Sequence, residues 1–233
     1  MDGPSQRAGR LMKTTLDILW KDMLIEWRAR SRTVALLSFA YTILLLFAFA
    51  IGPDAAALRQ HAGAYLWLGL LLSSTLLLDR SMRIEFEAGA VSNLLLVPVS
   101  APGLFYGKAI ANLLQLLLVG AFSIPLVYIV CDATMVESIG WLFLTLALGS
   151  AGLAAPGTLY SAMIARLSGK QLLLPLMLFP LVVPVIVSAV KATSLVMLGD
   201  PMNQIGSWLM LLGCFNLVYW GLCGVLFGRV VEA

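Results

Sequence analysis

The stretch that decides the fold is TVALLSFAYTILLLFAFAI, which occupies residues 33–51 and contains no charged side chain. The hydrocarbon core of a bilayer is about 30 Å thick, and a helix needs about 20 apolar residues to cross it. The rest of the chain is similar, since 61% of its 233 residues are apolar and only 12% are charged. A soluble domain carries about 25% charged residues, so we expect the bilayer to be the solvent of this chain.

Five further apolar segments follow the first, and the shortest reaches a spanning length only if His61, Ala62 and Gly63 extend it. The sequence therefore predicts an all-α integral membrane protein with about six transmembrane helices. We place them at about residues 33–51, 61–78, 109–130, 139–165, 172–190 and 205–227. Residues 1–32 then form an N-terminal cytoplasmic segment, and residues 33–233 form a six-span domain.

The basic residues predict the orientation. Lys and Arg gather on the cytoplasmic side of membrane proteins. With both termini inside, the external loops would hold only Arg59 and Lys191 of the 15 basic residues. The other 13 would be cytoplasmic: Arg7, Arg10, Lys13, Lys21, Arg28, Arg30, Arg32, Arg80, Arg83, Lys108, Arg166, Lys170 and Arg229. We therefore expect an N-in, C-in topology.

An amphipathic helix is predicted just before the first span. Between Leu16 and Trp27, apolar residues recur at helical spacing, while Asp17, Lys21, Asp22, Glu26 and Arg28 occupy the other face. Such a helix lies along the cytoplasmic membrane surface or acts as a simple anchor that fixes orientation, and the two interpretations are compatible.

The longest hydrophilic segment after the N-terminus is the cytoplasmic stretch from Asp79 to Lys108. It combines charged residues with an apolar patch, followed by Pro98 and Pro102, which suits docking onto a soluble partner. The docking candidates are Arg80, Arg83, Glu85, Glu87, Gly89, Leu94 and Leu95. The alternative is a solvated loop between two spans.

The sequence contains no recognisable motif for catalysis or metal binding. Neither Gly107-Lys108 nor Gly169-Lys170 belongs to a G-x-x-x-x-G-K-[ST] phosphate-binding loop, so we expect no ATP hydrolysis by this chain. We also expect no metal site or catalytic residue. Three cysteines lack metal-ligand spacing, and the single histidine, His61, is expected in an external loop as an ordinary interfacial residue. The grouped basic residues and a net charge of +3 do not favour nucleic acid as a partner.

The spans also lack the buried charge on which ion-coupled carriers depend. We place Lys108 at a cytoplasmic edge, which leaves Asn112, Gln115 and Asn216 as the strongest polar residues inside. Bend signals are present instead: Pro175, Pro180 and Pro184 fall in the fifth predicted span and are expected to bend it. A run of small residues between Gly149 and Gly157 allows close helix packing, or sliding during transport.

Three motifs carry a resemblance: RIEFEAG at residues 83–89, LLLVP at 94–98, and Gly107-Lys108. They resemble the cytoplasmic loop of ABC-2-type permeases. Within that group, the chain after about residue 12 resembles the cytochrome c maturation protein B family, the haem exporter permease subunit. The turn at residues 51–53 and the segment LLPLMLFPLVVP at residues 173–184 support the same resemblance.

The resemblance implies a multi-pass protein of the bacterial inner membrane that works with a separate ABC ATPase subunit, docked on the segment containing Arg80. It further implies a haem-handling membrane subunit, a small single-span subunit, and haem as the substrate handled by the complex. No haem ligand is assigned to this chain. An ABC-2-type permease for a lipid or drug, or a non-transporting membrane scaffold, remains an alternative.

Overall fold

The computed structural model describes residues 15–16, 18–24, 30–87, 101–134, 136–165 and 173–232. These form six long helices and contain no β-strand. The helices are α2 (Arg30–Ile51), α3 (Ala55–Glu87), α5 (Ala101–Cys131), α6 (Ile139–Ala165), α7 (Leu173–Leu198) and α8 (Ile205–Glu232). Each is long and apolar enough to cross a membrane, which confirms the all-α prediction and the six spans. A shorter N-terminal helical segment, described at residues 15–16 and 18–24, precedes them.

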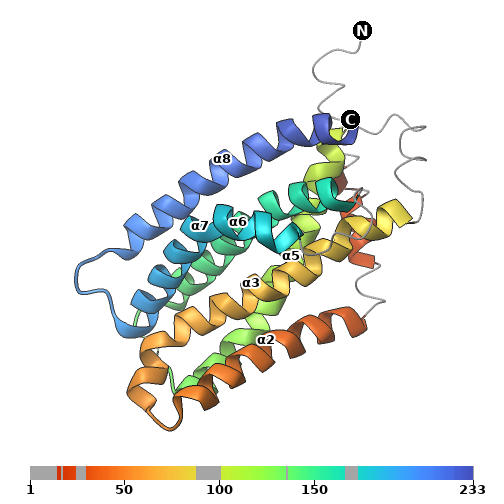
Figure 1. The fold of residues 1–233 in the computed structure, drawn as a ribbon. Helices are drawn as coiled ribbons and strands as arrows, with labels where there is room; N and C mark the ends of the chain where they lie inside the picture. The colour runs from red at the N-terminus through yellow and green to blue at the C-terminus, as the bar shows by residue number, and fades with distance from the viewer. Residues whose placement is uncertain are drawn as a thin grey trace.

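The long helices run side by side and alternate in direction, so α2 begins and α8 ends at the same end of the bundle (Figure 1). Helix α6 occupies the centre, where it packs against α3, α5, α7 and α8. Helix α2 lies at the periphery and exposes most of its surface. The charge distribution predicts that the end that holds Arg32, Arg80, Lys108 and Arg229 is cytoplasmic, and this end is called the cytoplasmic end below.

Small residues in α6 explain how a helix is surrounded so closely. The Cα of Gly152 faces Val185 of α7, and a Cβ there would lie 2.6 Å from the Val185 side chain. At Gly157 a Cβ would overlap the side chain of Leu78 in α3. The small-residue stretch thus serves helix packing within the chain, as such residues do in membranes.

The cytoplasmic stretch from Asp79 to Lys108 is more helical than we expected. Helix α3 continues to Glu87, and α5 already begins at Ala101, with Pro102 in its first turn. Hydropathy marks where a chain leaves the hydrocarbon, whereas a helix continues while its backbone hydrogen bonds propagate. Proline is tolerated in the first turn because no intrahelical bond needs its missing N–H.

Three residues that we expected in external loops also lie on helices. His61 is exposed on α3, Arg59 lies two residues earlier on the same helix, and Lys191 is exposed on α7. Arg59 pairs with Asp132, which directly follows α5, at the outer end of the bundle. The spans therefore extend further outward than the hydropathy boundaries.

Helix α7 continues through its prolines. Pro175 lies in the first turn, while Pro180 and Pro184 lie inside the helix. The hydroxyl of Ser188 donates to the Pro184 carbonyl oxygen at 2.7 Å. A bend of this helix at its prolines remains a prediction.

Candidate functional site

The N-terminal helical segment packs against the cytoplasmic end of α5. The Thr15 hydroxyl donates to the Gly103 carbonyl oxygen at 3.4 Å. Ile18 lies over Gly107, where an added Cβ would come within 2.9 Å of the Ile18 Cβ. Glycine at position 107 thus permits the two helices to approach closely. The segment is therefore held against the bundle.

The apolar side of the segment stays exposed, as expected for a helix at a membrane surface. Trp20 is 69% exposed and Leu16 is 57% exposed. Both are available to the lipid interface, where tryptophan is favoured. Trp27 and Asp17 lie outside the described residues.

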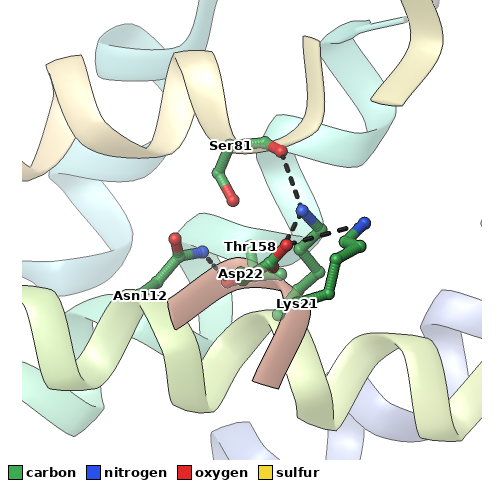
Figure 2. A network of polar contacts seen from close by, with 6 residues as sticks. Lys21, Asp22, Ser81, Asn112 and Thr158 are labelled. Atoms are coloured by element: carbon green, nitrogen blue, oxygen red, sulfur yellow. Dashed lines mark hydrogen bonds and ion pairs between the residues drawn. The ribbon is translucent and has the colours of Figure 1, made fainter. Parts of the chain in front are cut away.

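A buried ion pair joins this segment to the bundle (Figure 2). Lys108 Nζ lies 2.9 Å from Asp22 Oδ2, and the side chains of Lys108 and Asp22 are 6% and 14% exposed. Lys108 also donates to the Ser81 carbonyl oxygen of α3 at 3.4 Å. The exposed Lys21 lies 3.6 Å from the same aspartate. One lysine thus ties together the N-terminal segment, α3 and α5.

Lys108 lies near the end of α5 that we expect to be cytoplasmic, but the burial of its side chain was not predicted. The lysine lies within the apolar part of α5 and is almost inaccessible. A buried charge is costly unless it is paired and hydrogen-bonded. Asp22 and the Ser81 carbonyl supply those partners, so α3 and the N-terminal segment cover the lysine instead of leaving it in water.

A second polar contact continues the same face of α5. Asn112 lies one turn beyond Lys108, and its side-chain amide donates to the Thr158 hydroxyl of α6 at 2.9 Å. Thr158 in turn donates to the Ala154 carbonyl at 2.7 Å. The polar face of α5 therefore links the cytoplasmic contacts of Lys108 to the central helix α6.

A cavity of about 190 Å³ adjoins these residues at the cytoplasmic end of α2, α3 and α5. Asp22, Lys108 and Asn112 border it, together with Arg32 of α2 and Arg80 of α3. Leucines from all three helices complete its wall. The cavity combines cationic groups with an apolar lining.

Arg80 is the one predicted docking residue that borders this cavity, and it is exposed. The backbone of Arg83, Glu85 and Glu87 forms the end of α3, but their side chains lie outside the described residues. Gly89, Leu94 and Leu95 lie entirely outside them. Their role in docking a partner remains a prediction.

Sequence reasoning missed the Asp22–Lys108 pair and the part that Asn112 plays beside it. The available signal was spacing: Lys108, Asn112 and Gln115 stand at i, i+4 and i+7 in an otherwise apolar helix and share one face. Asp22 had been assigned only to the water-facing side of the amphipathic helix. Its partner lies far away in the chain, and helical periodicity carries no information about such pairing.

Within the described residues, no three His, Cys, Asp or Glu side chains gather to hold a metal ion. Cys131 and Cys223 are buried, and Cys214 is exposed. The contacts described above place charges and hydrogen bonds between neighbouring helices. They are suited to coupling helix positions.

Comparison with known proteins extends this picture over the whole chain. Residues 13–231 match the CcmB protein family. "Heme exporter protein B" of Paracoccus denitrificans is 31% identical over 189 residues, which cover 81% of this chain and 86% of that protein. The protein of the same description from Bradyrhizobium diazoefficiens is 30% identical over 186 residues, covering 80% of this chain and 83% of the relative. "Heme exporter protein B" of Rhodobacter capsulatus is 31% identical over 170 residues, or 73% of this chain and 78% of the relative. With six long apolar helices and a match from residue 13 to residue 231, this multi-pass membrane protein belongs to the CcmB protein family.

Proposed function

We propose that this chain is the membrane permease subunit of an ATP-driven haem exporter that serves the assembly of c-type cytochromes. The observation that carries the proposal is the family match over residues 13–231, together with relatives described as heme exporter protein B. The match covers all six spans, so the similarity is not confined to one apolar segment. The chain is a multi-pass protein of the bacterial inner membrane, and haem is cargo of the complex.

The ATPase partner follows from chemistry that this chain lacks, and the other proposed partners follow from the family resemblance. Its sequence contains no phosphate-binding loop, so ATP hydrolysis belongs to a separate ABC ATPase subunit. A haem-handling membrane subunit and a small single-span subunit complete the complex. This chain is then a transporter subunit without a catalytic centre of its own.

The cytoplasmic end of α3 is the best candidate for contact with the ATPase. The apolar span of this helix ends at Ser81, and the helix continues to Glu87. A partner that binds this extension would act directly on α3. Movement of α3 would reach α5 through the contact between the Ser81 carbonyl and Lys108.

From α5, two contacts would distribute that movement further. The Asp22–Lys108 ion pair would carry it to the N-terminal segment, and the Asn112–Thr158 hydrogen bond would carry it to α6. Both are short contacts between rigid helices, which is the physical requirement for transmitting a conformational change. The cytoplasmic polar contacts are thus suited to couple ATP-driven movement to the spans.

The test is deletion of the gene in its native bacterium, followed by complementation and haem staining of c-type cytochromes. We expect the deletion to abolish stained cytochromes and the wild-type gene to restore them. Affinity purification of the tagged chain from native membranes should recover an ABC ATPase. Normal cytochromes in the deletion strain would refute the haem function, and absence of any ATPase would refute the transporter subunit.

A further inference from the structure

We propose that the cavity between α2, α3 and α5 is a binding site for an anionic phospholipid of the cytoplasmic leaflet. Its phosphate would lie at Arg32 and Arg80, and an acyl chain would lie along the leucines deeper in the cavity. This inference does not depend on which substrate the complex carries.

The first step is the charge of the cavity. Lys108 and Asp22 both border it, but they pair with each other at 2.9 Å and so neutralise each other. Arg32 and Arg80 remain, and within the described part of the chain neither guanidinium has an ion-pair or hydrogen-bond partner. Two guanidinium groups on one cavity favour an anion with several oxygens, such as a phosphate.

The second step is the order of polar and apolar groups along the membrane normal. In α2, Leu36 lies one turn deeper than Arg32, and in α3, Leu76 lies one turn deeper than Arg80. One turn of helix is about 5.4 Å, so both helices place an arginine at the surface and a leucine beneath it. The same order in two antiparallel helices matches the order of head and tail in a lipid.

Helix α5 extends the apolar wall deeper into the bilayer. Leu114 and Leu118 border the cavity, and both are partly exposed, at 37% and 41%. Leu76 is 45% exposed. The apolar part of the cavity therefore communicates with the surface that faces lipid, and a membrane lipid can enter sideways.

The third step is the size and chemistry of the site. A volume of about 190 Å³ exceeds that of a roughly 150 Å³ apolar cavity known to hold benzene, so the site accepts an apolar group and not only an ion. The lining contains no histidine or cysteine among the described residues, which leaves no imidazole or thiolate for a haem iron. Basic pockets between spans at the cytoplasmic side are established sites for anionic lipid headgroups.

The experiment uses the purified full-length chain in neutral detergent, stripped of lipid and then titrated with phosphatidylglycerol or phosphatidylcholine. Bound lipid is counted by native mass spectrometry. We expect one phosphatidylglycerol to bind in preference to phosphatidylcholine. Arg32→Gln and Arg80→Gln should each weaken its binding by about tenfold, since each removes a charge-assisted hydrogen bond.

Two further variants separate the site from general effects of charge and folding. Lys191→Gln removes one positive charge from an exposed position at the outer end of α7 and should leave lipid binding unchanged. Ala35→Phe changes no charge, lies at an exposed position on the cavity wall, and should block the acyl chain. Helix content and monodispersity of each variant are measured alongside.

The outcomes are distinct. Equal binding of the two lipids, or phosphatidylglycerol binding that survives all three cavity variants, would overturn the proposal. Competition by inorganic phosphate at the same concentration as the lipid would reduce the site to a bare anion site and overturn the acyl-chain part. Haem binding that the arginine variants abolish and phosphatidylglycerol does not displace would assign the cavity to porphyrin carboxylates instead.

Discussion

Asp22 Oδ2 and Lys108 Nζ lie 2.9 Å apart, although one belongs to the N-terminal helical segment and the other to α5. Both side chains are largely removed from water, at 14% and 6% exposure. Because neither charge is stable there without the other, the position of the N-terminal segment and the burial of Lys108 depend on each other. The docked N-terminal segment is thus part of the folded structure of the bundle.

Replacement of Lys108 by Met should therefore release the N-terminal segment. Removing one partner of a buried ion pair costs about 3–5 kcal/mol, with the lower end expected because Asp22 retains some exposure. We expect a lower unfolding temperature in detergent and faster protease cleavage between the segment and α2. The matched control is Lys21→Met, which removes a charge near the same carboxylate from a side chain that is 46% exposed.

The double variant Asp22→Asn with Lys108→Met tests whether the loss of stability comes from the unpaired aspartate. It leaves neither charge unpaired, so it should be more stable than Lys108→Met alone. If Lys108→Met behaves like Lys21→Met, the pair contributes nothing measurable and the segment is held by other contacts.

Gly107→Ala should weaken the same docking without changing any charge. The new Cβ would lie 2.9 Å from the Ile18 Cβ and 3.1 Å from the Thr15 carbonyl oxygen, so the segment must move outward. We expect a cost of about 1–3 kcal/mol, as for overpacking, and a gain in protease sensitivity near the segment. Gly213→Ala is the control, because nothing lies within 4 Å of its Cβ position on α8. Partial rescue by Ile18→Gly, which removes the clashing Cβ, should follow, and equal stability of both glycine variants would rule out the close contact.

The sequence was sufficient to predict the spans because their apolar character is a local property. The uncharged stretch at residues 33–51 is long enough to be recognised as a span from hydropathy alone. Helix α6 begins and ends at the residues predicted. The ends of α3 and α5 were predicted less well, since a helix can continue past the hydrocarbon boundary without any change in hydropathy. The burial of Lys108 was not predicted because it depends on Asp22, which lies in another element. Pairing between distant segments is a tertiary property that spacing does not reveal.

Loss of the Asn112 amide should cost less than loss of Lys108. Hydrogen bonds between membrane helices contribute about 0.6 kcal/mol on average, because the separated helices also find partners. We therefore expect Asn112→Ala to lower stability modestly, with Thr158→Val showing a similar effect. A double-mutant cycle measures the coupling between them. Additive losses would show that the 2.9 Å contact between these side chains makes no energetic contribution.

The topology predicts the outcome of reporter fusions. Fusions after residues 55, 134 and 198 should report the outside of the membrane, and those after 90 and 168 the inside, because 13 of 15 basic residues then lie inside. Positions 55, 134 and 198 fall at the outer ends of α3, α5 and α7, which share one end of the bundle (Figure 1). An inside signal at residue 134 would contradict the predicted orientation.

The cytoplasmic extension of α3 gives the sharpest functional prediction. If an ATPase docks there, a charge on its surface sets register and excludes wrong partners, as charges at interfaces do. Glu87→Lys, or Trp in place of Gly89, should abolish cytochrome c maturation while membrane insertion remains normal. If the surface is only solvated, reversing one charge would change the free energy of unfolding by no more than about 1 kcal/mol, and maturation would continue.

A pull-down of the ATPase at matched expression separates these two possibilities. Glu232→Lys is the control, since it makes the same charge change at the cytoplasmic end of α8. We expect the ATPase to be lost from Glu87→Lys and retained by Glu232→Lys, because the proposed docking surface lies on the extension of α3 and not on α8. A third variant, Lys108→Met, should still bind the ATPase but lose cytochrome c maturation. It removes the proposed contact between α3 and α5 and leaves the docking surface unchanged. Retention of both the ATPase and maturation by Glu87→Lys and the Gly89 variant would place the coupling contact on another cytoplasmic segment.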